Sequence, residues 1–180
     1  RSEYLQSPTH LKLILSRKGF DSTAGGCPSP LIDGRPVSLP IPTRMPTPTR
    51  YGDITNGIAQ LVSDLTNRRI TPEHPCHLDP DIDTSALPRV HGWRATFGQV
   101  GPAQSHLANN QIGAGDLFVF WGLFQPVART GGGRWAFVGQ REHRIFGWLQ
   151  VDEVINVGTN PEACLTRHPW LKDHPHVHEG

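Results

Sequence analysis

The sequence predicts an α+β domain that combines a mostly antiparallel sheet or small barrel with two helices and long loops rich in proline and glycine. Three observations lead to this fold class. Strand-like apolar runs occur at residues 11–15 and again after residue 115, and helix-like segments lie between them. The 180 residues include 19 glycines and 17 prolines, which favour turns and irregular connections. Segregated strands and helices are typical of α+β proteins, and this length is typical of one domain.

The expected elements follow in chain order. A short buried strand covers residues 11–15 (LKLIL), and a proline-rich loop continues from there to residue 50. The clearest helix covers residues 53–69, where Asp53 can cap the start and apolar side chains recur at helical spacing. A second helix begins near Pro102, since proline is compatible with a first helical turn. Strands are expected over residues 115–124, 135–140 and 143–155.

Composition and charge narrow the functional classes. The formal net charge is +1, which excludes nucleic-acid binding through a general basic field. No apolar run approaches the roughly 18 residues of a membrane span, so we expect no membrane association. Three widely spaced cysteines form neither a CxxC motif nor a disulfide framework, which favours a reducing, cytoplasmic location.

The first polar constellation is SRKGFDSTAGGCPSP, residues 16–30. Arg17 and Lys18 can bind a phosphate, and the glycine pair allows backbone amides to approach an anion closely. Asp21 can act as a base, as a metal ligand or as the group that orients Arg17. The alternative interpretation is a surface turn with a structural Arg17–Asp21 ion pair.

The second constellation lies at residues 74–83. His77, Asp79, Asp81 and Asp83 alternate along the chain, so an extended backbone would point all four side chains to one side. Imidazole and carboxylate groups together suit acid–base chemistry or a divalent metal, for which we select His77, Asp79 and Asp81. The alternative is a solvated acidic loop in which aspartates cap a turn.

The third constellation, FGQVGPAQSHL, covers residues 97–107 and leads into the expected second helix. The amides of Gln99 and Gln104 match the donor and acceptor edges of nucleobases. His106 is a candidate for acid–base work, or else a core histidine with one hydrogen bond.

Two further patterns have simpler interpretations. Aromatic residues of the expected strands, such as Trp121 and Trp148, could stack on bases, but core packing is the commoner role. The alternating histidines of HPHVH (174–178) are interpreted as incidental metal affinity near the end of the chain.

Several strings together resemble the nucleotide modification associated domain family, specifically the third of that numbered group. They are SRKGFDS, GGCPSP, DGRPVSLPIP, HLDPD, FGQVGPAQSHL, GDLFVFWGLF, HRIFGWLQV and HPHV, in this order between residues 12 and 177. The resemblance implies an irregular lead-in over residues 1–11 and one family domain over residues 12–180. Relatives continue past HPHV with further strands, so we expect part of the sheet to lie beyond Gly180.

The resemblance also implies a link to base modification, inferred for this group from gene neighbourhoods in bacteria and phages. It adds His143 to the candidates selected on chemical grounds. The polar positions within the strings are Arg17, Lys18, Asp21, Ser22, Ser29, Asp33, Arg35, His77, Asp79, Asp81, Gln99, Gln104, His106 and His143.

The preferred hypothesis is a protein of a nucleotide or base modification system that binds a nucleotide or base in a polar cleft. Whether it is also an enzyme stays open, as do its oligomeric state and any divalent metal. The expected catalytic groups are Asp21, His77, Asp79 and His106, and the expected nucleotide- or phosphate-binding groups are Arg17, Lys18, Ser22, Arg35, Gln99, Gln104 and His143. The expected partners are a nucleotide or nucleic acid and other proteins of the system.

The alternative hypothesis is a module that reads a modified base without chemistry. GDLFVFWG and HRIFGWLQV are similar to the strand pair of PUA, ASCH and EVE barrels, in which Trp121 and Trp148 would stack on the base. A third possibility is an interaction subunit whose polar loops dock a partner. The preferred hypothesis requires the distant polar stretches to meet at one cleft.

Overall fold

The computed structural model describes residues 11–44 and 47–177. Its larger sheet contains β1 (Leu13–Arg17), β2 (Ser29–Ile32), β3 (Arg35–Pro36), β6 (Leu117–Arg129), β7 (Trp135–Phe137) and β8 (Glu142–Gln150), and a small second sheet pairs β4 (Ile41–Pro42) with β5 (Cys76–His77). The helices are α1 (Ile58–Leu65), α2 (Gly101–Asn109) and α3 (Pro161–Arg167), with 3-10 turns η1 (Tyr51–Asp53), η2 (Pro169–Leu171) and η3 (Pro175–Val177).

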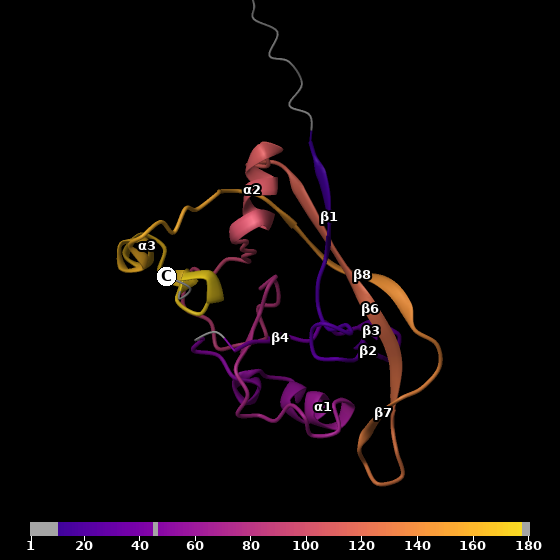
Figure 1. The fold of residues 1–180 in the computed structure, drawn as a ribbon. Coiled ribbons are helices and arrows are strands. Elements are labelled where there is room, and N and C mark those ends of the chain that lie inside the picture. The colour runs from indigo at the N-terminus through magenta and orange to yellow at the C-terminus, as the bar shows by residue number, and fades with distance from the viewer. Residues whose placement is uncertain (1–10, 45–46, 178–180) are drawn as a thin grey trace, which may run out of the picture.

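The long strand β6 is the centre of the larger sheet (Figure 1). Strands β1 and β2 pair with it in parallel, and β7 and β8 pair with it antiparallel. The α+β prediction is therefore confirmed, although the sheet is mixed. The expected small barrel does not form in the described residues, because β1 and β8 each pair with β6 alone and leave open edges.

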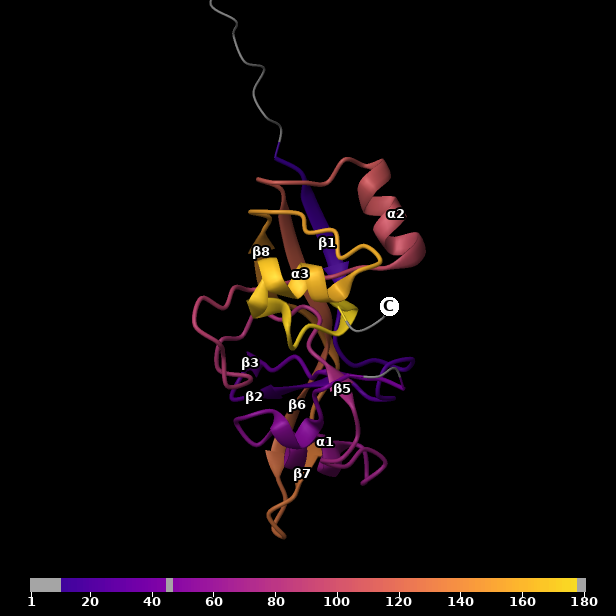
Figure 2. The same cartoon turned by 90° about the vertical axis from the view of Figure 1, so that its left-hand side faces the viewer.

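All three helices lie on one side of this sheet, as both views show (Figures 1 and 2). The sheet face toward them is lined by buried aromatic rings, among them Phe118, Phe120 and Phe124 of β6. Phe97, which precedes α2, packs its ring 4.9 Å from Phe118 and 5.2 Å from Phe120. Side chains of β6 therefore alternate between a face that packs its aromatic rings on the helix side and a face directed away from the helices.

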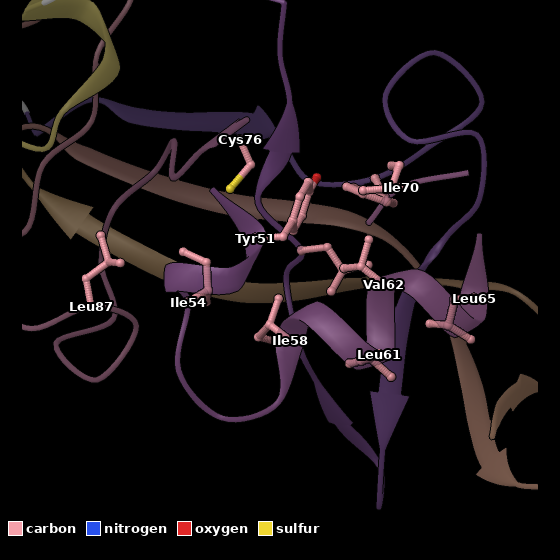
Figure 3. Packing of buried hydrophobic residues seen from close by; sticks show 11 residues of the cluster. Tyr51, Ile54, Ile58, Leu61, Val62, Leu65, Ile70, Cys76 and Leu87 are labelled. Carbon is pink, nitrogen blue, oxygen red and sulfur yellow. The ribbon is translucent and has the colours of Figure 1, made fainter. Parts of the chain in front are cut away.

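The main core forms where α1 covers the lower part of the sheet in Figure 1, and Figure 3 shows the side chains that pack there. α1 is amphipathic and buries Ile58, Leu61, Val62 and Leu65. Tyr51 of η1 is fully buried among them, and its hydroxyl donates a hydrogen bond to the Pro40 carbonyl at 2.6 Å.

Several sequence-based boundaries need correction. The helix expected over residues 53–69 is restricted to α1, because Gly57 and Asn67 adopt positive φ and end the helical geometry on each side. The helix expected near Pro102 is present as α2, whereas α3 was not predicted. The strand over residues 11–15 was expected to be buried. In the structure β1 begins at Leu13, and Leu13 and Leu15 are exposed on the side of the sheet without helices.

Candidate functional site

Four segments that are far apart in the sequence meet at the carboxylate of Asp79. Lys18, which follows β1, lies with Nζ 3.0 Å from Oδ2 of Asp79. The backbone N–H of Gly98 donates to Oδ1 at 3.1 Å. His176 of η3 lies with Nε2 3.8 Å from Oδ2. The site thus combines an ion pair, a backbone donor and an imidazole around one carboxylate.

Two glycines make this convergence possible. A Cβ atom on Gly98 would lie 2.2 Å from Cδ2 of His176 and 2.6 Å from Cε1 of His174. A Cβ atom on Gly122 of β6 would lie 2.6 Å from the carbonyl oxygen of Lys18. Real side chains essentially never approach so closely, so both positions require the absence of a side chain. The N–H of Lys18 donates to the carbonyl of Trp121, which continues the β1–β6 ladder up to the site.

The surroundings keep Asp79 ionised despite its burial. Burial by itself would raise the pKa of this carboxyl. The adjacent His176 imidazole, the charge of Lys18 and the Gly98 N–H outweigh that effect and lower the pKa to about 2. Lys18 is held in turn between this carboxylate and the ring of Phe97, whose centroid is 4.6 Å from Nζ.

A cavity of about 660 Å³ adjoins this centre. Phe118 and Leu149 line it from the sheet, and Gly98, His174 and His176 line it from the segments around Asp79. Gln99 and Gln104, before and within the first turn of α2, also line it. The volume falls within the roughly 300–1,000 Å³ of small-molecule sites, and the lining combines an apolar floor with a few polar groups.

Arg94 and Trp170 contribute to the same cavity. The guanidinium of Arg94 lies 5.0 Å from the centroid of the Trp170 ring and 3.3 Å from Oδ2 of Asp152. Both members of the Arg94–Asp152 pair are mostly exposed, so the pair contributes at most about 1 kcal/mol.

Some of the predicted residues come together here. Lys18 and Asp79 form the central ion pair, and Gln99 and Gln104 line the adjoining cavity. His77 lies near the same centre, with its ring centroid 6.3 Å from that of His176.

Others have structural partners elsewhere. Arg17 pairs with Asp21 at 3.2 Å, and Asp21 accepts hydrogen bonds from the N–H groups of Thr23 and Ala24. Partial burial would raise the pKa of Asp21, but these bonds and the charge of Arg17 hold it below its usual value. This arrangement is the capped surface turn that was the alternative interpretation of this segment.

The remaining candidates lie outside the Asp79 centre. Ser22, His106 and His143 are exposed, and His143 packs edge-on against Trp121 at 5.2 Å. Arg35 is exposed and lines a second cavity of about 960 Å³, to which Asp79 and Asp81 also contribute.

The aspartates that alternate in the sequence point to different partners. Asp81 accepts a two-fold hydrogen bond from Arg89, at 2.5 and 2.7 Å, and burial raises its pKa even against the charge of Arg89. Asp83 accepts from the N–H of Ser85. The chain bends at residues 79 and 80 instead of running extended, so the alternation does not bring the carboxylates together. Among residues 11–44 and 47–177, no cluster of three or more His, Cys, Asp or Glu side chains could hold a metal ion.

Sequence reasoning did not select Gly98, Arg94, His174 or His176. The string HPHV contained a signal for both histidines, but their place at the end of the chain suggested incidental metal affinity. His178, the third histidine of that pattern, lies outside the described residues. No pattern marks Arg94, whose contact with the cavity depends on tertiary packing.

A family model described as nucleotide modification associated domain 3 matches residues 12–180. No curated protein and no solved structure matches the chain. Within the described part of the chain, every helix is too short or too polar to span a bilayer.

Proposed function

The chain belongs to the nucleotide modification associated domain 3 family, and we propose that it binds a nucleobase or nucleotide and acts on it. The proposed binding site is the cavity of about 660 Å³ that His176 lines next to Asp79. Membership in the family connects the chain with a nucleotide modification system. One observation carries the finer proposal. His176 lies against the ionised Asp79 and lines the same cavity as Gln99 and Gln104.

The cavity lining suits a planar, polar ring. Phe118 and Leu149 offer an apolar surface to the faces of a base. The side-chain amides of Gln99 and Gln104 each carry a donor and an acceptor, which is the combination that a base edge requires. A basic surface is not needed for this mode of binding, in agreement with the net charge of +1.

Arg94 supplies the positive charge that a phosphate in the cavity requires. This residue lines the cavity, and its exposed pair with Asp152 is weak enough to exchange one anion for another. The N-cap residue of α2 is Val100, which supplies no side-chain cap to the N–H groups of the first helical turn. Those groups and Arg94 line the same cavity, and each of them favours a phosphate there.

The Asp79–His176 pair supplies acid–base capacity. A carboxylate beside an imidazole orients the ring and stabilises its protonated form. Lys18 and the Gly98 N–H hold the carboxylate in its ionised form, so His176 can exchange a proton with a ligand in the cavity. In this scheme His176 is the catalytic residue, whereas Asp79 and Lys18 are positioning residues.

Calorimetric titration with nucleosides and mononucleotides tests the binding step. We expect Gln104→Ala to weaken binding of the preferred ligand about tenfold, since an amide–base pair is worth on the order of 1–3 kcal/mol. Gln125→Ala is the matched control, because Gln125 binds the Gly139 carbonyl and does not line the cavity. Equal binding by the two variants would refute the cavity as the nucleotide site.

Mass spectrometry of nucleosides from treated DNA, RNA and free nucleotides tests the chemical step. We expect a modified product with the wild type and its loss in His176→Asn, while calorimetric binding by that variant persists. Binding without product from any of these substrates would instead favour the non-catalytic, base-reading function.

A further inference from the structure

We propose that the sheet face directed away from the helices is an interface between two copies of this chain. This outer sheet face carries the apolar side chains of Leu13 and Leu15 of β1, Val119 and Trp121 of β6, and Ile145 and Trp148 of β8, with Arg17 and His143 beside Trp121. Leu15, Val119 and Trp148 are paired in register and form one apolar row across the three strands.

The exposure of this face is unusual for side chains of this kind. Leu13, Leu15, Ile145 and Trp148 are 60–67% exposed, although strands with one solvated face normally carry polar residues there. The helices lie on the opposite side in both views, and no described segment covers the outer sheet face (Figures 1 and 2). Contiguous apolar patches of this size mark interaction sites.

The area of the face agrees with a protein partner. The exposed parts of Leu13, Leu15, Ile145 and Trp148 alone add up to on the order of 500 Å², against the roughly 800 Å² that each partner contributes to a standard interface. Trp148 lies within the patch, where an exposed aromatic side chain is typical of an interface anchor.

The chemistry of the face favours a second copy over a nucleic acid. Four of its six side chains are aliphatic and two are tryptophans. The cation at this face, Arg17, lies 5.7 Å from the centroid of the Trp121 ring and already pairs with Asp21. Nucleic-acid binding would require unpaired basic groups around the aromatic rings. A centre without charge is complementary to itself, and two sheets with the same twist can stack face to face. At a net charge of +1, two copies also repel each other little.

Sedimentation equilibrium of the full chain tests this proposal. We expect a dimer with a dissociation constant in the micromolar range or below, and a loss of at least tenfold in association for Leu15→Lys. Val154→Lys is the matched control, because Val154 is 67% exposed and Leu15 66%, but Val154 lies in the loop after β8. A double variant, Leu15→Lys with Trp148→Lys, should be fully monomeric.

Two results would overturn the proposal. One is a wild type that stays monomeric over the whole micromolar range. This result counts against the dimer even if Leu15→Lys also weakens binding to single-stranded oligonucleotides. The other is an equal loss of association in Leu15→Lys and Val154→Lys. The cavity lies on the opposite side of the sheet. A failure of the dimer proposal therefore leaves the proposed function untouched, and a failure of the proposed function leaves the dimer proposal untouched.

Discussion

Lys18 and Asp79 form a buried ion pair, Nζ to Oδ2 at 3.0 Å, between segments that lie 61 residues apart in the sequence. The Lys18 side chain is 13% exposed and that of Asp79 is 5% exposed. Removal of one partner leaves the other charge buried without compensation. We therefore expect Lys18→Met to lower the free energy of unfolding by about 3 kcal/mol, measured by urea denaturation.

The control is Arg144→Met, which breaks the exposed pair of Arg144 with Glu142 and should cost less than about 1 kcal/mol. Adding Asp79→Asn to Lys18→Met should recover part of the loss, because the double variant carries no uncompensated charge. Losses that simply add in the double variant would show that the two groups are not coupled.

The low pKa of Asp79 predicts a specific loss of stability in acid. Burial would raise this pKa, but His176, Lys18 and the Gly98 N–H lower it to about 2 from an ordinary value of 3.8. A depressed pKa stabilises the folded state above the ordinary value, and this contribution disappears as the pH falls toward about 2. The difference corresponds to about 2 kcal/mol.

The comparison of wild type with Asp79→Asn isolates this contribution. Urea titrations at several values from about pH 5 down to about pH 2 cover the range in which this carboxyl loses its charge. The free energies of unfolding of the wild type and of Asp79→Asn should converge as the pH falls. Parallel curves would mean that Asp79 has an ordinary pKa in the folded protein.

Gly98 should tolerate no side chain without loss of the site. In Gly98→Ala the new methyl group would lie 2.2 Å from Cδ2 of His176, so the imidazole must move away from Asp79. We expect a destabilisation of about 1–3 kcal/mol and loss of the modified nucleoside in mass spectrometry. Gly113→Ala is the control, since a Cβ atom there meets no atom within 4 Å. Unchanged product formation in Gly98→Ala would remove His176 from the site.

The sequence was sufficient for the α+β class and for some of the residues that converge around Asp79. α1 and β6 were predictable because their periodicity is local: Ile58, Leu61 and Leu65 repeat at helical spacing, and the aromatic residues of β6 alternate. Asp79, Gln99 and Gln104 were selected because their side chains carry the right chemistry within short motifs.

The remaining features depend on contacts that leave no local pattern. The parallel pairing of β1 with β6 joins residues more than 100 positions apart, and no periodicity indicates it. The same holds for His176 at Asp79, which lies 97 positions away in the chain. The exposed leucines of β1 show the opposite problem, because an apolar run alone does not tell a buried strand from one with an exposed face.

Tyr51 gives a test of the core that is independent of the site. Its hydroxyl is buried and donates to the Pro40 carbonyl at 2.6 Å within the cluster around α1 (Figure 3). Tyr51→Phe keeps the ring but leaves this carbonyl without the donor, so we expect the free energy of unfolding to fall by about 1–2 kcal/mol. Burial also raises the pKa of the Tyr51 hydroxyl strongly, so the hydroxyl stays protonated and can donate this bond at neutral pH. Urea denaturation at neutral pH measures the loss, and a variant as stable as the wild type would mean that water replaces the hydroxyl at Pro40.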